Sequence, residues 1–383
     1  MATAIGIHGC SPAGQPERDQ VHVRPLGLLY GREARQALVR GLAGPLAGGL
    51  AGDAAAGAMA FALAEVIHRC GETGEISRRL LPWPQLAEQA KRQPALAARL
   101  DGLAAPRLPP LPGRLDFSRP RIMGIVNVTP DSFSDGGLHT SAEAAMAHAR
   151  ALAAAGADIL DIGGESTRPG GDPVSEQEEM DRVLPVIERL AAEGFMVSVD
   201  TRKPAVMEAA VKAGAAIIND VQALQHAPDA AHRAAALGVP VILMHATSVP
   251  VDPAETVHYD DVATDVCAWL ETTVEQAETA GIAPTHIVVD PGIGFGKDCD
   301  ANLALSEGLA LFLELGRPVL FGASRKRYIG AVTGVEAPRA RLAGSLAVAL
   351  AALRQGAHII RVHDVAETVQ ATRMLEALSR GRC

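Results

Sequence analysis

Short apolar segments and longer helical segments alternate over the last two thirds of the chain. The apolar segments are runs of Ile, Val, Leu and Met with little polar alternation, which is typical of strands buried on both faces of a parallel sheet. This pattern predicts eight strands, at residues 122–126, 159–163, 196–199, 216–219, 241–244, 287–289, 318–322 and 358–362.

The segments between these strands are rich in Ala and Leu at helical spacing. They predict eight helices, near residues 141–155, 175–193, 204–213, 229–237, 260–281, 300–314, 338–355 and 364–379. Strict alternation of strand and helix favours an α/β fold of the (β/α)8 TIM barrel type. A doubly wound open sheet is the alternative, but eight strands favour closure.

The region before the barrel has a different pattern. Residues 1–103 show helical spacing, and within them Asp53 to Cys70 predicts a helix with Asp53 as its N-cap. We therefore expect a mainly helical N-terminal extension of unknown role. Residues 104–120 contain five prolines and predict a Pro-rich linker, which leaves residues 121–383 for the barrel.

Composition narrows the class of partner. The formal charge is −9 and no dense block of Lys and Arg occurs, which argues against a nucleic-acid partner. The five cysteines are scattered without a CxxC pair, so we expect neither a disulfide framework nor a zinc site. We expect the protein to be located in the reducing cytoplasm. The most apolar run, residues 54–64, is shorter than the roughly 20 residues of a spanning helix, so no membrane segment is expected.

Polar side chains follow every predicted strand. The strand exits carry Asn127, Glu165 to Arg168, Asp200, Asn219 and Asp220, Met244 and His245, Asp290, Ser324 to Lys326, and Arg361 to Asp364. Any one of these could simply cap a helix or shape a turn. In a parallel barrel, however, all of the exits open on one face, so eight polar exits together predict an active site there.

Several of these groups are suited to an anion. Arg361 and His363 are two residues apart on a strand and share one side of it, where they could clamp an anion. Thr167 and Arg168 stand in a glycine-flanked loop and offer a hydroxyl and a guanidinium for phosphate oxygens. The glycines of DPGIGFGK do not indicate a nucleotide site, because Asp298 stands where a Walker motif needs Ser or Thr.

No cluster of Cys and His has zinc spacing, and no Ser, His and Asp set stands out as a nucleophilic triad. A metal ion would instead be a hard cation held mainly by substrate oxygens and water, with one protein oxygen such as that of Asn127. Mg²⁺ is the ion that we expect.

Seven stretches resemble the dihydropteroate synthase family. They are, in chain order, IMGIVNVTPDSFSDGG, GADILDIGGESTRPG, SVDT, IIND, DPGIGFGK, GASRK and RVHD, between residues 122 and 364. The resemblance implies a transferase of folate biosynthesis that condenses 6-hydroxymethyl-7,8-dihydropterin diphosphate with 4-aminobenzoate, releasing 7,8-dihydropteroate and diphosphate. It also implies Mg²⁺, a homodimer and a target of sulfonamides.

The resemblance also assigns roles to matching residues. The catalytic set would be Asn127, Arg168, Arg361 and His363, with Asn127 as the metal ligand. The pterin diphosphate would contact Asn127, Thr167, Asp200, Asn219, Met244, Asp290, Lys326, Arg361 and His363. The 4-aminobenzoate would contact Phe133, Arg168, Phe295, Ser324 and Lys326.

One stretch departs from the family pattern. After the fifth strand, family members often have Met-His-x-Gln-Gly-x-Pro, whereas this chain has MHATSVP at residues 244–250. This departure and the extension leave open that the chain is a non-catalytic pterin-binding paralogue. A second alternative is a related pterin-binding barrel that transfers a methyl group from methyltetrahydrofolate to a corrinoid, although the intact loops NVTPDSFSDGG and GGESTRPGG argue against it.

Overall fold

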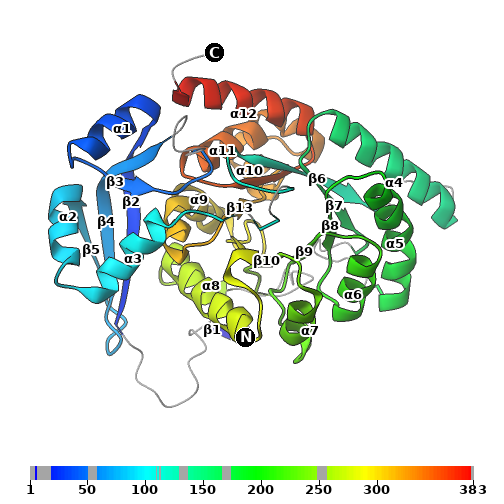
Figure 1. The fold of residues 1–383 in the computed structure, drawn as a ribbon, viewed down its shortest axis with the longest axis horizontal. Helices are drawn as coiled ribbons and strands as arrows, with labels where there is room; N and C mark the ends of the chain where they lie inside the picture. The colour runs from blue at the N-terminus through cyan, green and yellow to red at the C-terminus, as the bar shows by residue number, and fades with distance from the viewer. Residues whose placement is uncertain are drawn as a thin grey trace.

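The computed structural model describes residues 5–6, 19–50, 58–108, 110–111, 114–128, 137–165, 174–247 and 257–380. Two parts are visible in Figure 1: a barrel, and a smaller sheet-containing extension in blue and cyan that lies against one flank of it. Among the described residues, no helix combines the length and apolar character needed to cross a bilayer.

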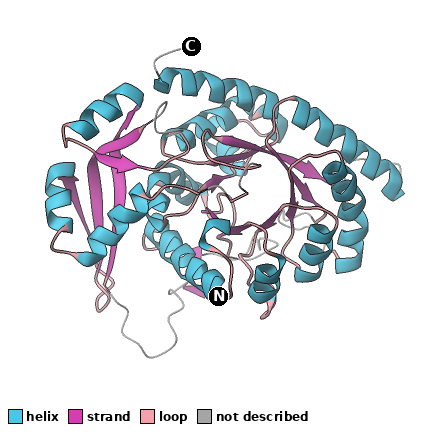
Figure 2. Ribbon diagram, in the orientation of Figure 1, coloured by secondary structure: helices cyan, strands magenta, loops and turns pink. Residues whose placement is uncertain are grey.

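The barrel is built on eight parallel strands in the order β12-β10-β9-β8-β7-β6-β14-β13. A bridge between Val289 and Val319, with a hydrogen bond of 3.0 Å from the Val289 amide to the Pro318 carbonyl, joins the two ends and closes the ring seen in Figure 2. All eight predicted strands are confirmed. They are β6 (Arg121–Asn127), β7 (Ile159–Gly163), β8 (Val197–Asp200), β9 (Ile217–Asp220), β10 (Val241–Met244), β12 (Ile287–Asp290), β13 (Leu320–Phe321) and β14 (Ile359–Val362).

The predicted helices form the outer layer. They are α4 (Gly137–Ala154), α5 (Glu176–Ala192), α6 (Pro204–Lys212), α7 (Ala230–Leu237), α8 (Val262–Thr279), α9 (Cys299–Glu307), α11 (Leu342–Arg354) and α12 (Val365–Arg380). Two of the elements that were not predicted lie in the last third of the barrel. The segment 300–314 changes after Gly308 into the 3₁₀ helix η3 (Leu309–Leu315), and the short α10 (Arg327–Thr333) follows β13. Ser175, Asp261 and Asp298 cap α5, α8 and α9 by accepting backbone amides.

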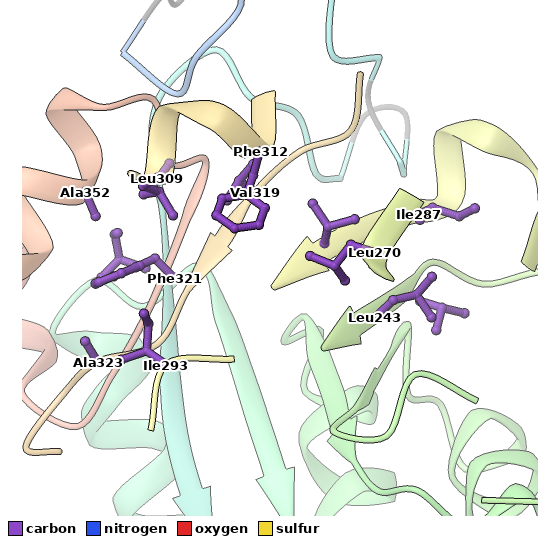
Figure 3. Packing of buried hydrophobic residues seen from close by; sticks show 14 of the residues in the cluster. Leu243, Leu270, Ile287, Ile293, Leu309, Phe312, Val319, Phe321, Ala323 and Ala352 are labelled. Carbon is purple, nitrogen blue, oxygen red and sulfur yellow. The ribbon is translucent and has the colours of Figure 1, made fainter. Parts of the chain in front are cut away.

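Two layers of apolar side chains hold the barrel together. Between strands and helices, Leu270 of α8, Phe312 of η3 and Phe321 of β13 belong to one buried cluster, part of which is drawn in Figure 3. A second cluster gathers residues from the first half of the strands. Leu115 and Phe117, from the segment predicted as a linker, are buried in it. This segment therefore does more than connect two parts, because it also supplies core to the barrel.

The extension is not mainly helical, so that expectation was wrong. It contains an antiparallel sheet of β2 (Gln20–Tyr30), β3 (Gly44–Leu46), β4 (Met59–Arg69) and β5 (Ile76–Pro82), with helices α1 (Gly31–Val39), α2 (Trp83–Ala90) and α3 (Pro94–Ala104). A two-residue strand, β1 (Ile5–Gly6), pairs in parallel with β11 (Val257–His258).

The error falls on the segment from Asp53 to Cys70, most of which is β4. Its Ala-rich composition favours a helix, yet β4 is the central strand and is paired with β2 along one edge and with β3 and β5 along the other. Backbone pairing on both edges outweighs the modest helix preference of Ala, which is below about 1 kcal/mol per residue.

A buried polar junction joins the extension to the barrel. The Glu314 carboxylate of η3 accepts hydrogen bonds from Nδ1 of His22 at 2.6 Å and from the Val23 amide at 2.7 Å, both on β2. The Cys267 thiol of α8 donates to it at 3.6 Å. These three side chains place possible metal ligands within 4.8 Å of one another, but their mutual hydrogen bonds already satisfy the carboxylate. We therefore interpret the cluster as a junction between the two parts.

Two further contacts hold α3 of the extension tightly against the barrel. Arg99 of α3 donates to both oxygens of Glu271 on α8, at 2.5 and 2.9 Å. At Gly102 of α3, an added Cβ would stand 1.9 Å from the Glu314 carbonyl oxygen. Only glycine permits this approach of α3 to η3, so the extension is packed onto the barrel as a fixed part of the fold.

Candidate active site

Arg361 is the centre of a largely buried polar cluster at the carboxyl ends of the strands. Its Nε donates to Asp161 Oδ2 at 2.7 Å, and its Nη2 donates to Asp200 Oδ2 at 2.6 Å. Asn219 Nδ2 donates to the same Asp161 oxygen at 3.0 Å. Four strands, β7, β8, β9 and β14, thus bring together three of the predicted residues and one residue that was not predicted.

Asp161 is the residue that sequence reasoning missed. It stands inside the apolar run ILDIG, which was read only as a strand, and its side chain is 0% exposed. A charge in a fully buried strand is costly unless it is paired. The aspartate within an apolar run was therefore the signal in the sequence that could have identified this residue. Its Oδ1 has no hydrogen-bond partner among the described residues, so only one oxygen is satisfied.

We call the face of the barrel at the carboxyl ends of the strands the mouth. Burial there disfavours the charged forms of its carboxyl groups. Burial raises the pKa of Asp200 to about 7; Arg361 opposes this rise and Asp161 adds to it. Burial also raises the pKa of Asp290, whose Oδ1 accepts the Gly292 amide at 2.8 Å. Asp220, beside Asn219, has a pKa of about 6 because it is buried. Both oxygens of Asp220 already accept backbone amides, from Gln222 and Leu224, whereas Asp200 and Asp290 would gain from a ligand that donates hydrogen bonds.

Lys326 faces the same carboxylates. Its Nζ donates to the Ile293 carbonyl and lies 4.4 Å from the centre of the Phe295 ring. Burial lowers the pKa of this lysine to about 8, although Asp290 draws it upward. Phe295 in turn packs against a small apolar cluster that contains Met244 and Val221. The predicted residues Met244, Asp290, Phe295 and Lys326 are therefore close together.

Ser324 and His363 form a second part of the mouth. Nδ1 of His363 lies 3.0 Å from the Ser324 hydroxyl, which also accepts the His363 amide at 3.2 Å. Arg325, between Ser324 and Lys326, has a positive φ of 61° and forms a two-pronged ion pair with Asp364. This ion pair joins the GASRK and RVHD loops and holds a strained backbone between two predicted site residues.

Asn127 ends β6 in register with Gly163, which is itself in register with Asp200. A Cβ placed on Gly163 would lie 3.8 Å from Asn127 Oδ1 and 3.6 Å from Asp200 Oδ2, so both side chains border the same position. The half-buried carboxamide of Asn127 is thus close to the Arg361 cluster, as predicted.

Phe133, Thr167 and Arg168 lie outside the described residues. The base of the loop that carries two of them is well anchored. Glu165 accepts from Arg202 at 3.1 Å and from the Val174 amide at 3.2 Å, and Lys203 donates to the Val174 carbonyl at 2.6 Å. Burial would raise the pKa of Glu165, but these donors and the lysine bring it below its ordinary value.

The family profile described as "Pterin binding enzyme" matches residues 123–363. Dihydropteroate synthase of Escherichia coli K12 is 50% identical over 264 residues, which cover 69% of this chain and 93% of that protein. Dihydropteroate synthase of Bacillus subtilis is 46% identical over 258 residues, covering 67% of this chain and 88% of the relative.

Solved structures agree. Xanthomonas albilineans dihydropteroate synthase with 4-aminobenzoic acid is 55% identical, with a TM-score of 0.64, and the match covers 68% of this chain and 93% of that one. The same enzyme in complex with 7,8-dihydropteroate is 53% identical, with a TM-score of 0.63 over 70% and 96% of the two chains. The chain therefore belongs to the pterin-binding transferases of the dihydropteroate synthase family.

Proposed function

We propose that this chain condenses 6-hydroxymethyl-7,8-dihydropterin diphosphate with 4-aminobenzoate, giving 7,8-dihydropteroate and diphosphate in folate biosynthesis. One observation carries the proposal. Arg361, Asp161, Asp200 and Asn219 form a desolvated polar cluster at the mouth of a pterin-family barrel, and Asp290 and Lys326 interact electrostatically with it.

The pterin ring would bind at this cluster. Its edge presents an amino group and ring N–H donors beside carbonyl and ring-nitrogen acceptors. Asp200 and Asp290 can accept from the donors, and Asn219 and Lys326 can serve the remaining positions. Hydrogen bonds from the ring to the two carboxylates would favour their charged forms and offset the effect of burial on their pKa values.

The diphosphate would lie toward Arg361, His363 and Asn127. Burial lowers the pKa of Arg361, but Asp161 and Asp200 outweigh it, so the guanidinium remains charged. It can stabilise negative charge that develops on the leaving group or stack on the ring. The Asn127 carboxamide oxygen fits a hard cation that is held mostly by substrate oxygens, because Arg361 already engages the nearby carboxylates. Mg²⁺, when bound, would neutralise charge on the diphosphate.

The second substrate would approach along Phe295, Ser324 and Lys326, with Phe133 and Arg168 as further proposed contacts. Its aromatic amine is mostly neutral at pH 7, so attack on the methylene carbon requires no dedicated base. Sulfonamides would compete for the same position. The protein of Yersinia pestis, solved with a sulfonamide drug, is 47% identical to this chain, with a TM-score of 0.65.

A homodimer and a cytoplasmic location complete the proposal and remain predictions. The turnover experiment uses the full chain with both substrates and Mg²⁺, and follows dihydropteroate and diphosphate in equal amounts. Folded protein that forms no product at high enzyme concentration would refute the proposal. If such protein binds the pterin diphosphate without turnover, it is a paralogue. If it transfers methyl groups to a corrinoid, it is the alternative enzyme.

A further inference from the structure

The motif DPGIGFGK ends in Lys297, a lysine that the proposed chemistry does not use. Its Nζ lies 2.9 Å from Nδ1 of His245 and donates to the carbonyls of Gly292 and Phe295, each at 2.9 Å. A longer contact of 3.4 Å reaches the His245 carbonyl. The amine therefore binds two loops at once, the one after β10 and the one after β12.

The backbone is shaped to surround this amine. Gly292 and Gly296 have φ values of 69° and 65°, in the left-handed region. A Cβ on Gly292 would stand 1.8 Å from the His245 carbonyl oxygen, and one on Gly296 would stand 1.8 Å from Thr247 Oγ1. Both glycines are thus required for the loop to fold back toward β10, and this fold-back turns two of its carbonyls onto Nζ.

The surroundings of Lys297 also change the pKa values of this lysine and of His245. Burial lowers the pKa of Lys297 to about 7, and Lys326 lowers it further while Asp290 opposes. Burial and Lys297 hold the pKa of His245 well below its ordinary value, so the imidazole is neutral. Its Nδ1 can then accept from Nζ, with the ring proton on Nε2. The ring packs edge-on against Trp269, with centroids 4.8 Å apart.

The loop that Lys297 holds carries several parts of the mouth. Phe295, whose carbonyl binds Nζ, packs with Met244 and lies under Lys326. The Ile293 carbonyl accepts from Lys326, and Asp290 begins the loop. Asn302 of α9 supports the other side by accepting the Gly294 amide at 2.6 Å. A shift of this loop would move the Phe295 ring together with the Ile293 carbonyl, which accepts a hydrogen bond from Lys326.

We propose that Lys297 is a positioning residue for this active site: its amine gathers the Gly292 and Phe295 carbonyls and the His245 imidazole, and so fixes Phe295 and Lys326 against the pterin. The inference rests on the proposed function. In this proposal Lys297 does not touch substrate. It differs in this from the lysine of a Walker motif, which binds the nucleotide phosphates.

The test compares Lys297→Met, which retains the length of the side chain but has no donor, with wild type and with Lys212→Met. Lys212 is an exposed lysine on α6 and serves as the matched control. We expect Lys297→Met to raise KM for the pterin diphosphate and to weaken binding of 7,8-dihydropteroate about tenfold to a hundredfold, as expected for a displaced binding group. Lys212→Met should match wild type in both measurements.

Lys297→Gln retains a polar end that reaches fewer acceptors, so its losses should fall between those of wild type and Lys297→Met. It also replaces the Met variant if that variant does not fold. The proposal would be overturned if either variant folds and, per folded molecule, has the same KM for the pterin diphosphate and the same affinity for 7,8-dihydropteroate as wild type. So would failure of both variants to fold, which would assign Lys297 to stability alone. Absence of turnover in wild type would instead refute the proposed function.

Discussion

The active-site mouth and the junction between extension and barrel are both largely buried polar clusters, but they differ in how far their carboxylates are satisfied. At the junction, Glu314 accepts two hydrogen bonds shorter than 3 Å and a third from a thiol. At the mouth, one Asp161 oxygen has no hydrogen-bond partner among the described residues, and the pKa values of Asp200 and Lys326 are displaced toward the neutral forms.

This difference separates a structural cluster from a functional one. A group whose charge is fully compensated inside the protein gains nothing from a ligand, whereas desolvated groups with spare hydrogen-bonding capacity do. This contrast supports our proposal that the mouth binds the substrates and that the junction holds the extension.

The largest effect should come from removing the extension. A chain that begins at Arg119 loses Leu115 and Phe117 from the base of the barrel and leaves Glu314 without His22 and Val23. An unpaired buried carboxylate together with a lost core contact costs several kcal/mol. We expect aggregation or a strongly lowered melting temperature. A shortened chain as soluble and heat-stable as the full one would show that the junction is dispensable.

Arg361→Met should have the next largest effect. The change removes the cation that holds Asp161 and Asp200, and with it the proposed contact to the diphosphate. Loss of a preorganised charge-stabilising group costs about 3 to 4 kcal/mol in transition-state stabilisation, or about 10² to 10³ in kcat/KM. Steady-state kinetics with both substrates measure this loss. Turnover within threefold of wild type would remove Arg361 from the site.

Glu314→Gln is the matched change at the junction. The amide keeps the shape but loses the charge that pairs with His22 and Arg99. We expect the free energy of unfolding to fall by about 1 to 3 kcal/mol in urea titrations, with kcat/KM unchanged. A catalytic defect as large as that of Arg361→Met would erase the distinction between the two clusters.

The smallest effect is a pH dependence of stability. Burial raises the pKa of Asp200 to about 7 in the folded state, above its ordinary value of 3.8 in the unfolded chain. The folded state then binds more protons between these values, so stability falls as the pH rises through this window. Urea midpoints of wild type should decrease from pH 5 to pH 7.5, and those of Asp200→Asn should decrease less. Parallel curves would contradict the raised pKa.

The sequence predicted the barrel well because each buried strand is a run of apolar residues, and the polar exits follow directly from it. It failed for β4, whose Ala-rich segment is a strand only because three neighbouring strands pair with it. Asp161 was missed because it is part of an apolar run, and its ion pair with Arg361 spans 200 positions of sequence. Such a contact depends on the closed barrel and leaves no local pattern.

The most direct test of the distinction is the dissociation constant of 7,8-dihydropteroate for wild type, Arg361→Met and Glu314→Gln, measured in one assay on folded protein. We predict binding at least about tenfold weaker for Arg361→Met, since a hydrogen bond to a charged group contributes about 1.5 to 3 kcal/mol, and unchanged binding for Glu314→Gln. Equal constants for all three proteins, or the weaker binding in Glu314→Gln, would contradict it.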